Sequence, residues 1–241
     1  MFELNSQLIE KFQAYGAFHI IPVLVMGLSC YFFIRKAKNW TYSYQLLWAK
    51  IFTTCIVLTI VGWMGIKLVN HQFDPRIDLP FHLCNILPFA TLLILLTDNQ
   101  KYFGILYFSI LAGTLQAIIT PDLKEAYPHY IYFRYWIIHC GLVMLVFYFI
   151  LVLQWRVYYK DIRIAMYYAN GYLVFSILIN IWSGGNYFFS MAKPEAASLL
   201  DYLGPWPLYL LTGQLAMYVL FVLLYQPVKR IALQKDIAGK N

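Results

Sequence analysis

Acidic residues are scarce in this chain, which has 11 Asp and Glu against 18 Lys and Arg in 241 residues. None of the 11 falls inside the seven long apolar segments described below. Coupled transporters usually need buried ionisable residues for the driving ion, so the missing carboxylates weigh against that class. Charged residues make up only 12% of the chain and hydrophobic residues 61%, which excludes an ordinary water-soluble domain.

Metal-binding and disulfide patterns are also missing. The four cysteines form no CxxC pair and show no disulfide-framework spacing. No HxxxH or HExxH pair occurs either, and the sequence predicts no cofactor. His82, Cys84 and His139 would be the three ligands of a metal-dependent hydrolase, which we keep as an alternative.

Long apolar runs fill most of the remaining chain. About 20 apolar residues cross the hydrocarbon core as a helix, and continuous runs favour helices over a closed barrel. We therefore predict an all-α, polytopic membrane helical bundle with seven transmembrane helices, forming a single integral membrane domain over residues 1–241. The first run carries no basic cluster before it and no small-x-small site after it, so we expect it to be retained. The predicted spans are Ala17–Ile34, Leu46–Ile66, Pro80–Thr97, Tyr102–Thr120, Ile131–Gln154, Ile162–Gly184 and Trp206–Tyr225.

Basic residues predict the orientation of the bundle. Seven spans divide the 18 Lys and Arg into twelve on one side and six on the other. By the positive-inside rule the richer side is cytoplasmic, so the N-terminus is outside and the C-terminus inside. The net charge of +7 then reflects topology and lipid headgroups, and we predict no nucleic-acid partner. We expect an integral membrane protein, in the plasma membrane if the chain is bacterial.

Polar residues within the spans gather toward the predicted outer ends. Such residues usually face the bundle interior or a wet cavity, so this asymmetry predicts an outward-facing polar cavity. Isolated histidines near the interface can also simply bind water or headgroups, and Asn or Thr can join helices without further function. The residues predicted to line the cavity or bind substrate are His82, Asn85, Gln116, Thr120, Arg134, Asn186 and Trp206.

Cys84 and His139 are the predicted catalytic pair. Cys84 follows a helix start marked by Asp78 and Pro80, where the helix dipole stabilises a thiolate. Pro88 cannot donate a backbone hydrogen bond to the Cys84 carbonyl, which leaves that turn irregular. His139 lies at a similar depth in the fifth span, and a histidine within reach of a cysteine forms a nucleophile and its base.

Two outer segments are predicted to form short surface-lying helices. Residues 194–204 begin with Pro and Glu and end with Gly, and Leu199, Leu200 and Leu203 would face lipid. Leu8, Ile9, Phe12 and Tyr15 recur at helical spacing near the N-terminus. We favour simple anchoring over a gated lid for both segments.

Several motifs resemble one known family. The string LPFHLCNILPF, Leu79 to Phe89, resembles the signature of multi-pass proteins that include bacterial YwaF-type proteins and animal transmembrane protein 164. Four further strings are similar to the family's remaining motifs and arrive in the same order, so the resemblance covers about positions 75 to 225. These strings are ITPDL (Ile119–Leu123), PHYIYFRYWIIHCG (Pro128–Gly141), GGNYFF (Gly184–Phe189) and LGPWPLY (Leu203–Tyr209).

The resemblance implies an activity as well as a fold. Animal members of the family are described as acyltransferases that move an acyl chain between phospholipids by means of a cysteine and a histidine. Motif alignment places those roles on Cys84 and His139. The implied partners are membrane lipids, with a phospholipid acyl donor and a lysolipid acceptor, or water in an acyl hydrolase. Asn85, Asn186 and the amides of Gly184 and Gly185 are candidate oxyanion donors.

Two other functional classes remain open from the residues alone. A small-molecule transporter or channel would also suit several spans with an outer polar vestibule. A non-catalytic seven-span receptor or structural membrane protein would need only the topology, which is a weak basis for function. The sequence makes no prediction about the oligomeric state.

Overall fold

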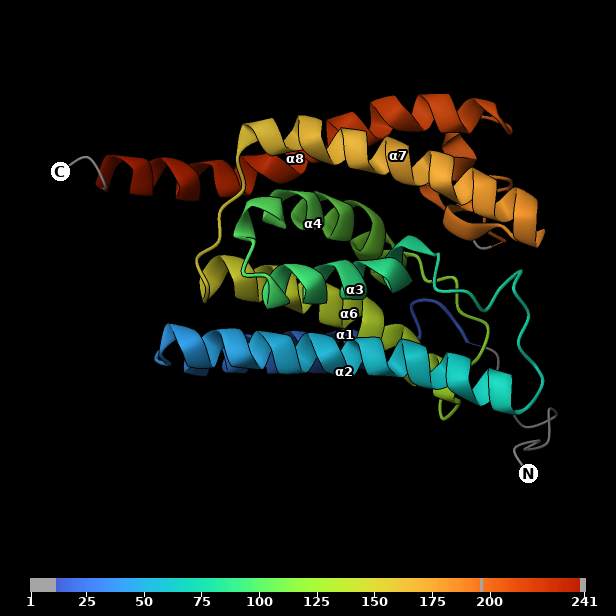
Figure 1. Ribbon diagram of the computed structural model, residues 1–241, viewed down its shortest axis with the longest axis horizontal. Helices are drawn as coiled ribbons and strands as arrows, with labels where there is room; N and C mark the ends of the chain where they lie inside the picture. The colour runs from blue at the N-terminus through green and yellow to red at the C-terminus, as the bar shows by residue number, and fades with distance from the viewer. Residues whose placement is uncertain (1–11, 196, 239–241) are drawn as a thin grey trace.

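Helices account for the regular structure in the described part of the chain, residues 12–195 and 197–238 of a computed structural model. The long helices run along one common axis (Figure 1) and alternate in direction along the chain. The α7–α8 pair lies on one side and the α1–α2 pair on the other, with α3, α4 and α6 between them. The elements are α1 (Ala17–Ala37), α2 (Tyr42–Val69), α3 (Leu83–Leu96), η1 (Gln100–Tyr102), α4 (Phe103–Ser109), η2 (Ile110–Thr114), α5 (Leu115–Ile119), α6 (Tyr130–Leu151), α7 (Tyr159–Ser183), η3 (Tyr187–Phe189), η4 (Leu199–Leu203) and α8 (Leu208–Ala238).

Six helical segments in the described residues are long and apolar enough to cross a membrane. They are α1, α2, the continuous run Gln100–Ile119, α6, α7 and the part Leu208–Lys229 of α8. Their outer faces are strongly apolar, with Leu178 61%, Leu211 73% and Leu215 69% exposed. Soluble monomers rarely expose contiguous apolar patches of this kind, whereas lipid-facing helices do so by nature. The bundle is therefore that of an integral membrane protein.

Helix α3 differs from the predicted third span. It begins at Leu83 instead of Pro80 and has 14 residues, so it extends about 21 Å, less than the hydrocarbon thickness of about 30 Å. His82 is its N-cap residue in an extended conformation, and the chain before it forms turns. The Asp78 carboxylate does not cap the helix, because it accepts a hydrogen bond from the Asp74 amide. The seventh crossing therefore depends on α3 and is not settled by helix length.

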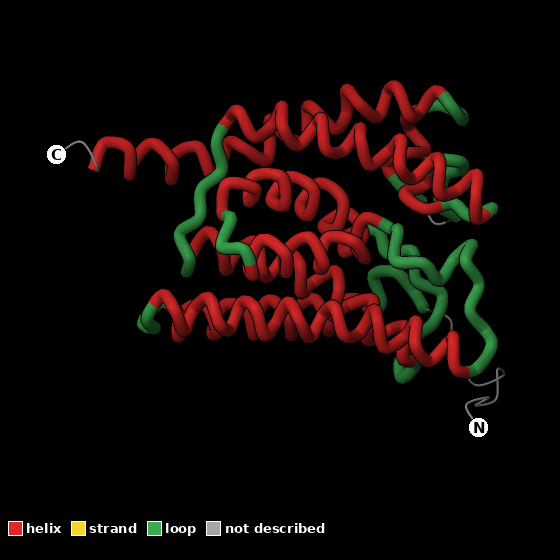
Figure 2. Tube along the Cα trace, in the orientation of Figure 1, coloured by secondary structure: helices red, strands yellow, loops and turns green. Residues whose placement is uncertain are grey.

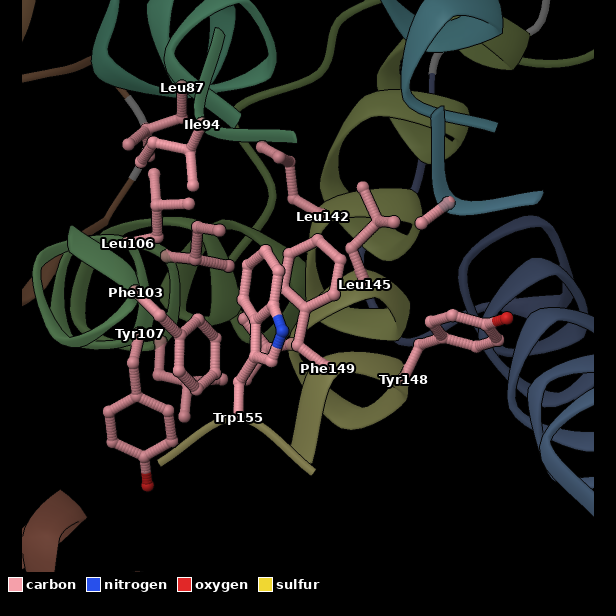
Figure 3. Close-up of a cluster of buried hydrophobic side chains, with 14 of the residues drawn as sticks. Leu87, Ile94, Phe103, Leu106, Tyr107, Leu142, Leu145, Tyr148, Phe149 and Trp155 are labelled. Carbon is pink, nitrogen blue, oxygen red and sulfur yellow. The ribbon is translucent and has the colours of Figure 1, made fainter. Parts of the chain in front are cut away.

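The centre of the bundle is an aromatic core shared by α4, α6 and the segment that follows α6. The Phe103 ring meets Phe149 edge-on at 5.6 Å, and Phe149 stacks on Trp155 at 4.8 Å. Figure 3 shows these rings together with Leu106, Leu142 and Leu145. Offset and edge-on ring pairs add to the free energy gained by burial, so this cluster fixes α6 against α4.

Connecting segments gather at one end of the bundle, which we name the cavity end. It is the end at which α2 and α7 finish and α3, α6 and α8 begin (Figure 2). The segment after α7 is fastened to the segment before α3, because Tyr187 Oη accepts from the Leu79 amide at 3.0 Å and donates to the Pro75 carbonyl at 2.8 Å. The Asn180 side chain donates to the Tyr187 carbonyl at 2.9 Å and accepts from the Tyr187 amide at 2.7 Å. These hydrogen bonds fix the segment before α3 against the end of α7 and the segment that follows it.

The predicted surface helix near residues 194–204 is shorter than expected. The structure has a 3-10 helix, η4, over Leu199–Leu203, and Leu199 and Leu200 line an internal cavity instead of facing only lipid. Phe12 and Tyr15 precede α1 without forming a helix, and Leu8 and Ile9 lie outside the described residues.

A close contact between α4 and α7 makes a direct test of this packing. A Cβ added to Gly104 would lie 2.3 Å from Asp161 Oδ2, and that carboxylate accepts a hydrogen bond from the Tyr158 amide at the start of α7. We expect Gly104→Ala to lower the free energy of unfolding by about 1–3 kcal/mol through overpacking. Thermal unfolding of the purified protein in detergent measures the change.

Gly171→Ala is the matched control, because nothing lies within 4 Å of an added Cβ at that position in α7. It should raise the stability by about 0.5–1 kcal/mol, as expected for alanine in place of a mid-helix glycine. Equal effects of the two substitutions would contradict the described contact between α4 and α7.

Candidate functional site

A cavity of about 470 Å³ lies at the cavity end between the α7–α8 pair and the central helices. Its walls come from the start of α3, from η2 and α5, from one face of α6, and from α7, α8 and the segment between them. The wall formed by α7 and α8 is mainly apolar and includes Ala169, Leu173, Leu210, Gly213 and Met217. The opposite wall contains most of the polar side chains.

Helix α6 presents a single face to the cavity. The lining residues Ile131, Arg134, Tyr135, Ile138 and His139 follow the i, i+3, i+4 spacing of one helical face. His129 starts the helix, and its side chain accepts a hydrogen bond from the Ile131 amide at 3.3 Å.

His139 is held in one tautomer. Its Nδ1 lies 2.7 Å from the carbonyl oxygen of Tyr135, one helical turn earlier. A carbonyl oxygen only accepts, so Nδ1 carries the hydrogen and Nε2 of the neutral ring is left as an acceptor. The Tyr135 ring lies against the imidazole with the centroids 4.0 Å apart, and Tyr135 is itself fixed by donating to the Ala117 carbonyl at 2.7 Å. The arrangement suits a base whose ring cannot rotate freely.

Cys84 occupies the second position of α3 and is partly buried in the cavity wall. It is nearer to the helix start than the sequence predicted, because α3 begins at Leu83. The first N–H groups of a helix have no intrahelical partner, and the side chain of the N-cap residue His82 does not bind them. Pro88 lies inside α3 and leaves the Cys84 carbonyl without its usual donor, as predicted.

Arg134 reaches across from α6 to α3. Its terminal nitrogen lies 3.2 Å from the side-chain oxygen of Asn85, the residue after Cys84. Arginine only donates, so this contact orients the Asn85 amide with its nitrogen directed elsewhere. Arg134 Nε is buried and has no hydrogen-bond partner, and no ion pair to Arg134 occurs among the described residues.

A π-helical turn, η2, interrupts the fourth long helix where it lines the cavity. Such turns are frequent at functional sites, because one extra residue per turn redirects side chains. Thr114, at its end, has a buried hydroxyl with no hydrogen-bond partner. Gly113 lets this turn approach α3, since an added Cβ would lie 3.1 Å from Leu83 Cδ2.

The remaining predicted site residues divide into two groups. His82, Gln116 and Thr120 line the same cavity as Cys84 and His139. Asn186 and Trp206 are not among the lining residues. Asn186 donates to the Ala192 carbonyl at 2.9 Å and accepts from its amide at 3.1 Å, and Trp206 donates to the Ser190 carbonyl at 3.1 Å. These two side chains stabilise the segment between α7 and α8.

The glycine amides proposed as oxyanion donors are engaged in the turn after α7. Gly184 adopts φ 73°, a left-handed conformation that ends the helix, and its amide donates to the Asn180 carbonyl at 2.8 Å. The Gly185 amide donates to Ser183 Oγ at 3.1 Å. Asn85 is the predicted donor that does line the cavity.

Asp122 and Gln214 are cavity residues that the sequence analysis did not select. Asp122 belongs to the string ITPDL, which was a usable signal, whereas Gln214 lies in α8 without any motif. Desolvation raises the pKa of the Asp122 carboxyl, Lys124 acts in the opposite direction, and Glu195 adds to the rise. The Lys124 ammonium is paired with Glu195 at 2.7 Å.

The metal-dependent alternative has no ligand set in the described residues. No group of three or more His, Cys, Asp or Glu side chains there is arranged to hold a metal ion. His82 contacts aromatic rings instead, with ring centroids 5.2 Å from Tyr187 and 5.5 Å from Phe189.

The long apolar helices and the cavity between them, with polar side chains on one wall, define a multi-pass helical membrane protein. Residues 14–225 match the model of the TMEM164 family. The chain therefore belongs to the TMEM164 family, as its motifs predicted. A protein of Treponema pallidum (strain Nichols), described as uncharacterized, is 27% identical over 172 residues, which cover 69% of this chain and 70% of that protein. No solved structure matches the chain.

Thiol labelling tests the electrostatics of the cavity. Because Arg134 is the unpaired cation closest to Cys84 along this wall, an anionic methanethiosulfonate reagent should modify Cys84 about three- to tenfold faster than a cationic reagent of the same size. The modified peptide is identified by mass spectrometry in a Cys55→Ala background, since Cys55 is exposed on α2. Equal rates for the two reagents, or no modification of Cys84 before unfolding, would contradict the described cavity.

Proposed function

We propose that this protein is a Cys/His-dependent acyltransferase or acyl hydrolase that acts on membrane lipid esters. The observation that carries the proposal is that Cys84 from α3 and His139 from α6 line one cavity, with Nε2 of His139 left as an acceptor. A thiol and a fixed imidazole base in one site are the parts that nucleophilic acyl transfer requires.

The reaction would proceed in two balanced steps. His139 Nε2 takes the Cys84 proton while the sulfur attacks the ester carbonyl, and the protonated imidazole then returns the proton to the departing lipid alkoxide. This leaves an acyl thioester on Cys84. A second hydroxyl, from a lysolipid or from water, loses its proton to His139 and attacks the thioester, which restores the thiol and completes the transfer.

Stabilisation of the tetrahedral oxyanion would come from the start of α3. The side-chain nitrogen Nδ2 of Asn85 forms no hydrogen bond with a described residue, and the side-chain oxygen of Asn85 already accepts from Arg134. The Leu83 and Cys84 amides have no partner among the described residues, whereas the Asn85 and Ile86 amides donate to the His82 carbonyl, and the positive end of the helix dipole lies at this first turn. One preorganised donor of this kind contributes about 3–4 kcal/mol to transition-state stabilisation in known acyl-transfer enzymes.

Lipid is the substrate class that fits the remaining walls. The α7 and α8 residues of the cavity are apolar, which suits an acyl chain. Resemblance to the animal members favours a phospholipid acyl donor and a lysolipid acceptor, with water as the acceptor if the protein is a hydrolase.

The topology proposed from the sequence places this cavity toward the outer leaflet. In that arrangement α3, together with the turn before it, makes the seventh crossing, the N-terminus is outside and the C-terminus is cytoplasmic. The basic residues support it, because twelve of the 18 lie on the side that would be cytoplasmic. We propose one integral membrane domain, in the plasma membrane if the cell is bacterial.

A small-molecule transporter or channel is the second candidate. The cavity and the unpaired Thr114 hydroxyl favour it, because both are compatible with a polar solute. A non-catalytic receptor or structural role rests on the topology alone.

Lipidomics of cells expressing the wild type, Cys84→Ala and His139→Asn tests the proposal. Asparagine keeps an N–H donor near the Tyr135 carbonyl but supplies no base, so it separates proton transfer from packing. We expect the wild type to shift the acyl-chain distribution of phospholipids, and each variant to lose at least about 100-fold of that activity.

Cys55→Ala is the matched control, since Cys55 is exposed on α2 away from the cavity, and it should behave as the wild type. Full activity of Cys84→Ala would rule out the thiol mechanism. A wild type that leaves lipids unchanged but accumulates a labelled solute would favour transport instead.

A further inference from the structure

Arg134 carries a positive charge that no described residue neutralises. It is the one Lys or Arg among the described residues that line the cavity, and it forms no ion pair with a described carboxylate. One terminal nitrogen donates to Asn85, while Nε is buried without any partner. A guanidinium has five N–H donors in a fixed fork, so most of its donor capacity is unused.

Arg134 is half-buried with a buried Nε, and an unpaired charge in this position is costly unless a ligand supplies the missing hydrogen-bond acceptors. Buried charges in proteins are normally paired, and a planar guanidinium matches the oxygens of a carboxylate or a phosphate bidentately. Arg76 shows the ordinary solution on the same end of the protein, because its guanidinium binds Asp74 at 2.7 Å. Arg134 lacks any such internal partner and faces a cavity.

The charged and titratable groups near Arg134 do not replace a ligand. Asp78 is a carboxylate whose charge acts on Arg134, but Asp78 accepts from the Asp74 amide and lies 3.7 Å from Lys67. Tyr130 donates its hydroxyl proton to the Thr59 carbonyl at 3.0 Å. Asp122 lines the cavity from the segment after α5 and forms no hydrogen bond or ion pair with Arg134, and His82 and His139 lie in the cavity walls.

The spacing of Arg134 and His139 along α6 sets their order along the axis of the bundle. Arg134 precedes His139 by five residues, which places it about 7.5 Å nearer to the cavity end along the helix axis. A glycerophospholipid has the same order along the membrane normal, with the phosphodiester nearest to water, the ester carbonyls deeper and the acyl chains deepest. Asn85 links the level of Arg134 to that of Cys84, because its side chain contacts Arg134 and it follows Cys84 directly in the chain.

We infer that Arg134, supported by Asn85, is a phosphodiester-binding residue that positions the substrate's ester carbonyl over Cys84. Phosphodiester binding is inferred from the unpaired guanidinium alone. The positioning of the ester carbonyl over Cys84 rests on the proposed function. Arg134 then selects esters that carry a phosphodiester on the same glycerol unit, in preference to neutral glycerides with the same acyl chains.

Arg134→Gln and Arg134→Lys, assayed with two donors, separate this role from others. The donors are dioleoylphosphatidylcholine and dioleoylglycerol in mixed micelles, which share acyl chains and differ in the phosphate. Arg134→Gln should lower kcat/KM for the phospholipid by about ten- to a hundredfold, mainly through KM, and change that for the diacylglycerol less than about twofold. Arg134→Lys should recover part of the loss, because it keeps the charge without the bidentate fork.

Arg76→Gln is the matched control, since Arg76 lies on the same end of the protein but is paired and does not line the cavity. It should leave both donors unchanged. An equal loss on both donors in Arg134→Gln, accompanied by a shifted pH profile for iodoacetamide alkylation of Cys84, would make Arg134 a thiolate-stabilising group and overturn the inference.

A binding measurement keeps the inference testable if the protein shows no acyl transfer. Displacement of a fluorescent short-chain phosphatidylcholine is measured on Cys84→Ala and on Cys84→Ala/Arg134→Gln in maltoside micelles, with dodecylphosphocholine or inorganic phosphate as competitor. We expect dodecylphosphocholine to compete about ten- to a hundredfold less well in the double variant, and phosphate alone to compete weakly in both. Unchanged displacement in the double variant, or equal competition by inorganic phosphate, would contradict a lipid phosphodiester site.

Discussion

Hydrocarbon cannot satisfy a polar group, and this constraint organises the whole protein. Every backbone and side-chain donor or acceptor inside the bundle must find a partner within the chain or face a cavity. Most do so locally, as when Thr53 and Thr91 donate to the carbonyl one turn earlier and Gln45 binds the turn after α1. Of the groups left over, the indole nitrogens of Trp48, Trp136 and Trp155 lie away from the cavity. Arg134 Nε, Thr114 Oγ1 and the Leu83 and Cys84 amides at the start of α3 lie around it.

The cavity exists because regular helix is interrupted on several sides of it. Helix α3 is short, begins only at Leu83 and contains Pro88. The π-helical turn η2 and Gly113 let the Gln100–Ile119 helical run pass close to the start of α3. Gly184, in a left-handed conformation, ends α7 just before the segment between α7 and α8. Broken helices are tolerated in membranes only where they line protein or water. The same breaks bring Cys84 to the start of a helix and leave room for a ligand between α6 and the α7–α8 pair.

Hydropathy predicts most of this fold, because lipid-facing helices must be long and apolar. Six of the predicted spans correspond to long helices, with ends displaced by a few residues where Pro207, Gln154 or Gly184 set the boundary. The sequence could not give the true start of α3, since Pro80 and Asp78 resemble a helix start but serve a turn. It also gave no sign of η2, because π-helical turns have no sequence signature of their own.

The candidate site was predicted in part. Motif and depth selected seven residues that do line the cavity, including Cys84, His139 and Arg134. Asn186 and Trp206 were selected in the same way, but their side chains hydrogen-bond within the segment between α7 and α8. The sequence alone does not distinguish such a short-range hydrogen bond from a cavity contact. The sequence also did not identify Tyr135, whose carbonyl sets the tautomer of His139, because that contact depends on the helical geometry of α6.

We propose that the Cys84 sulfur carries the acyl group, and mass spectrometry of the protein after acid quenching tests this proposal most directly. Purified protein is mixed with a phospholipid donor in the absence of any acceptor. We expect an acyl adduct that is removed by neutral hydroxylamine and maps to the peptide containing Cys84, with Cys30, Cys55 and Cys140 unmodified. Consumption of the donor with Cys84 remaining a free thiol, or an adduct on one of the other cysteines, would contradict it.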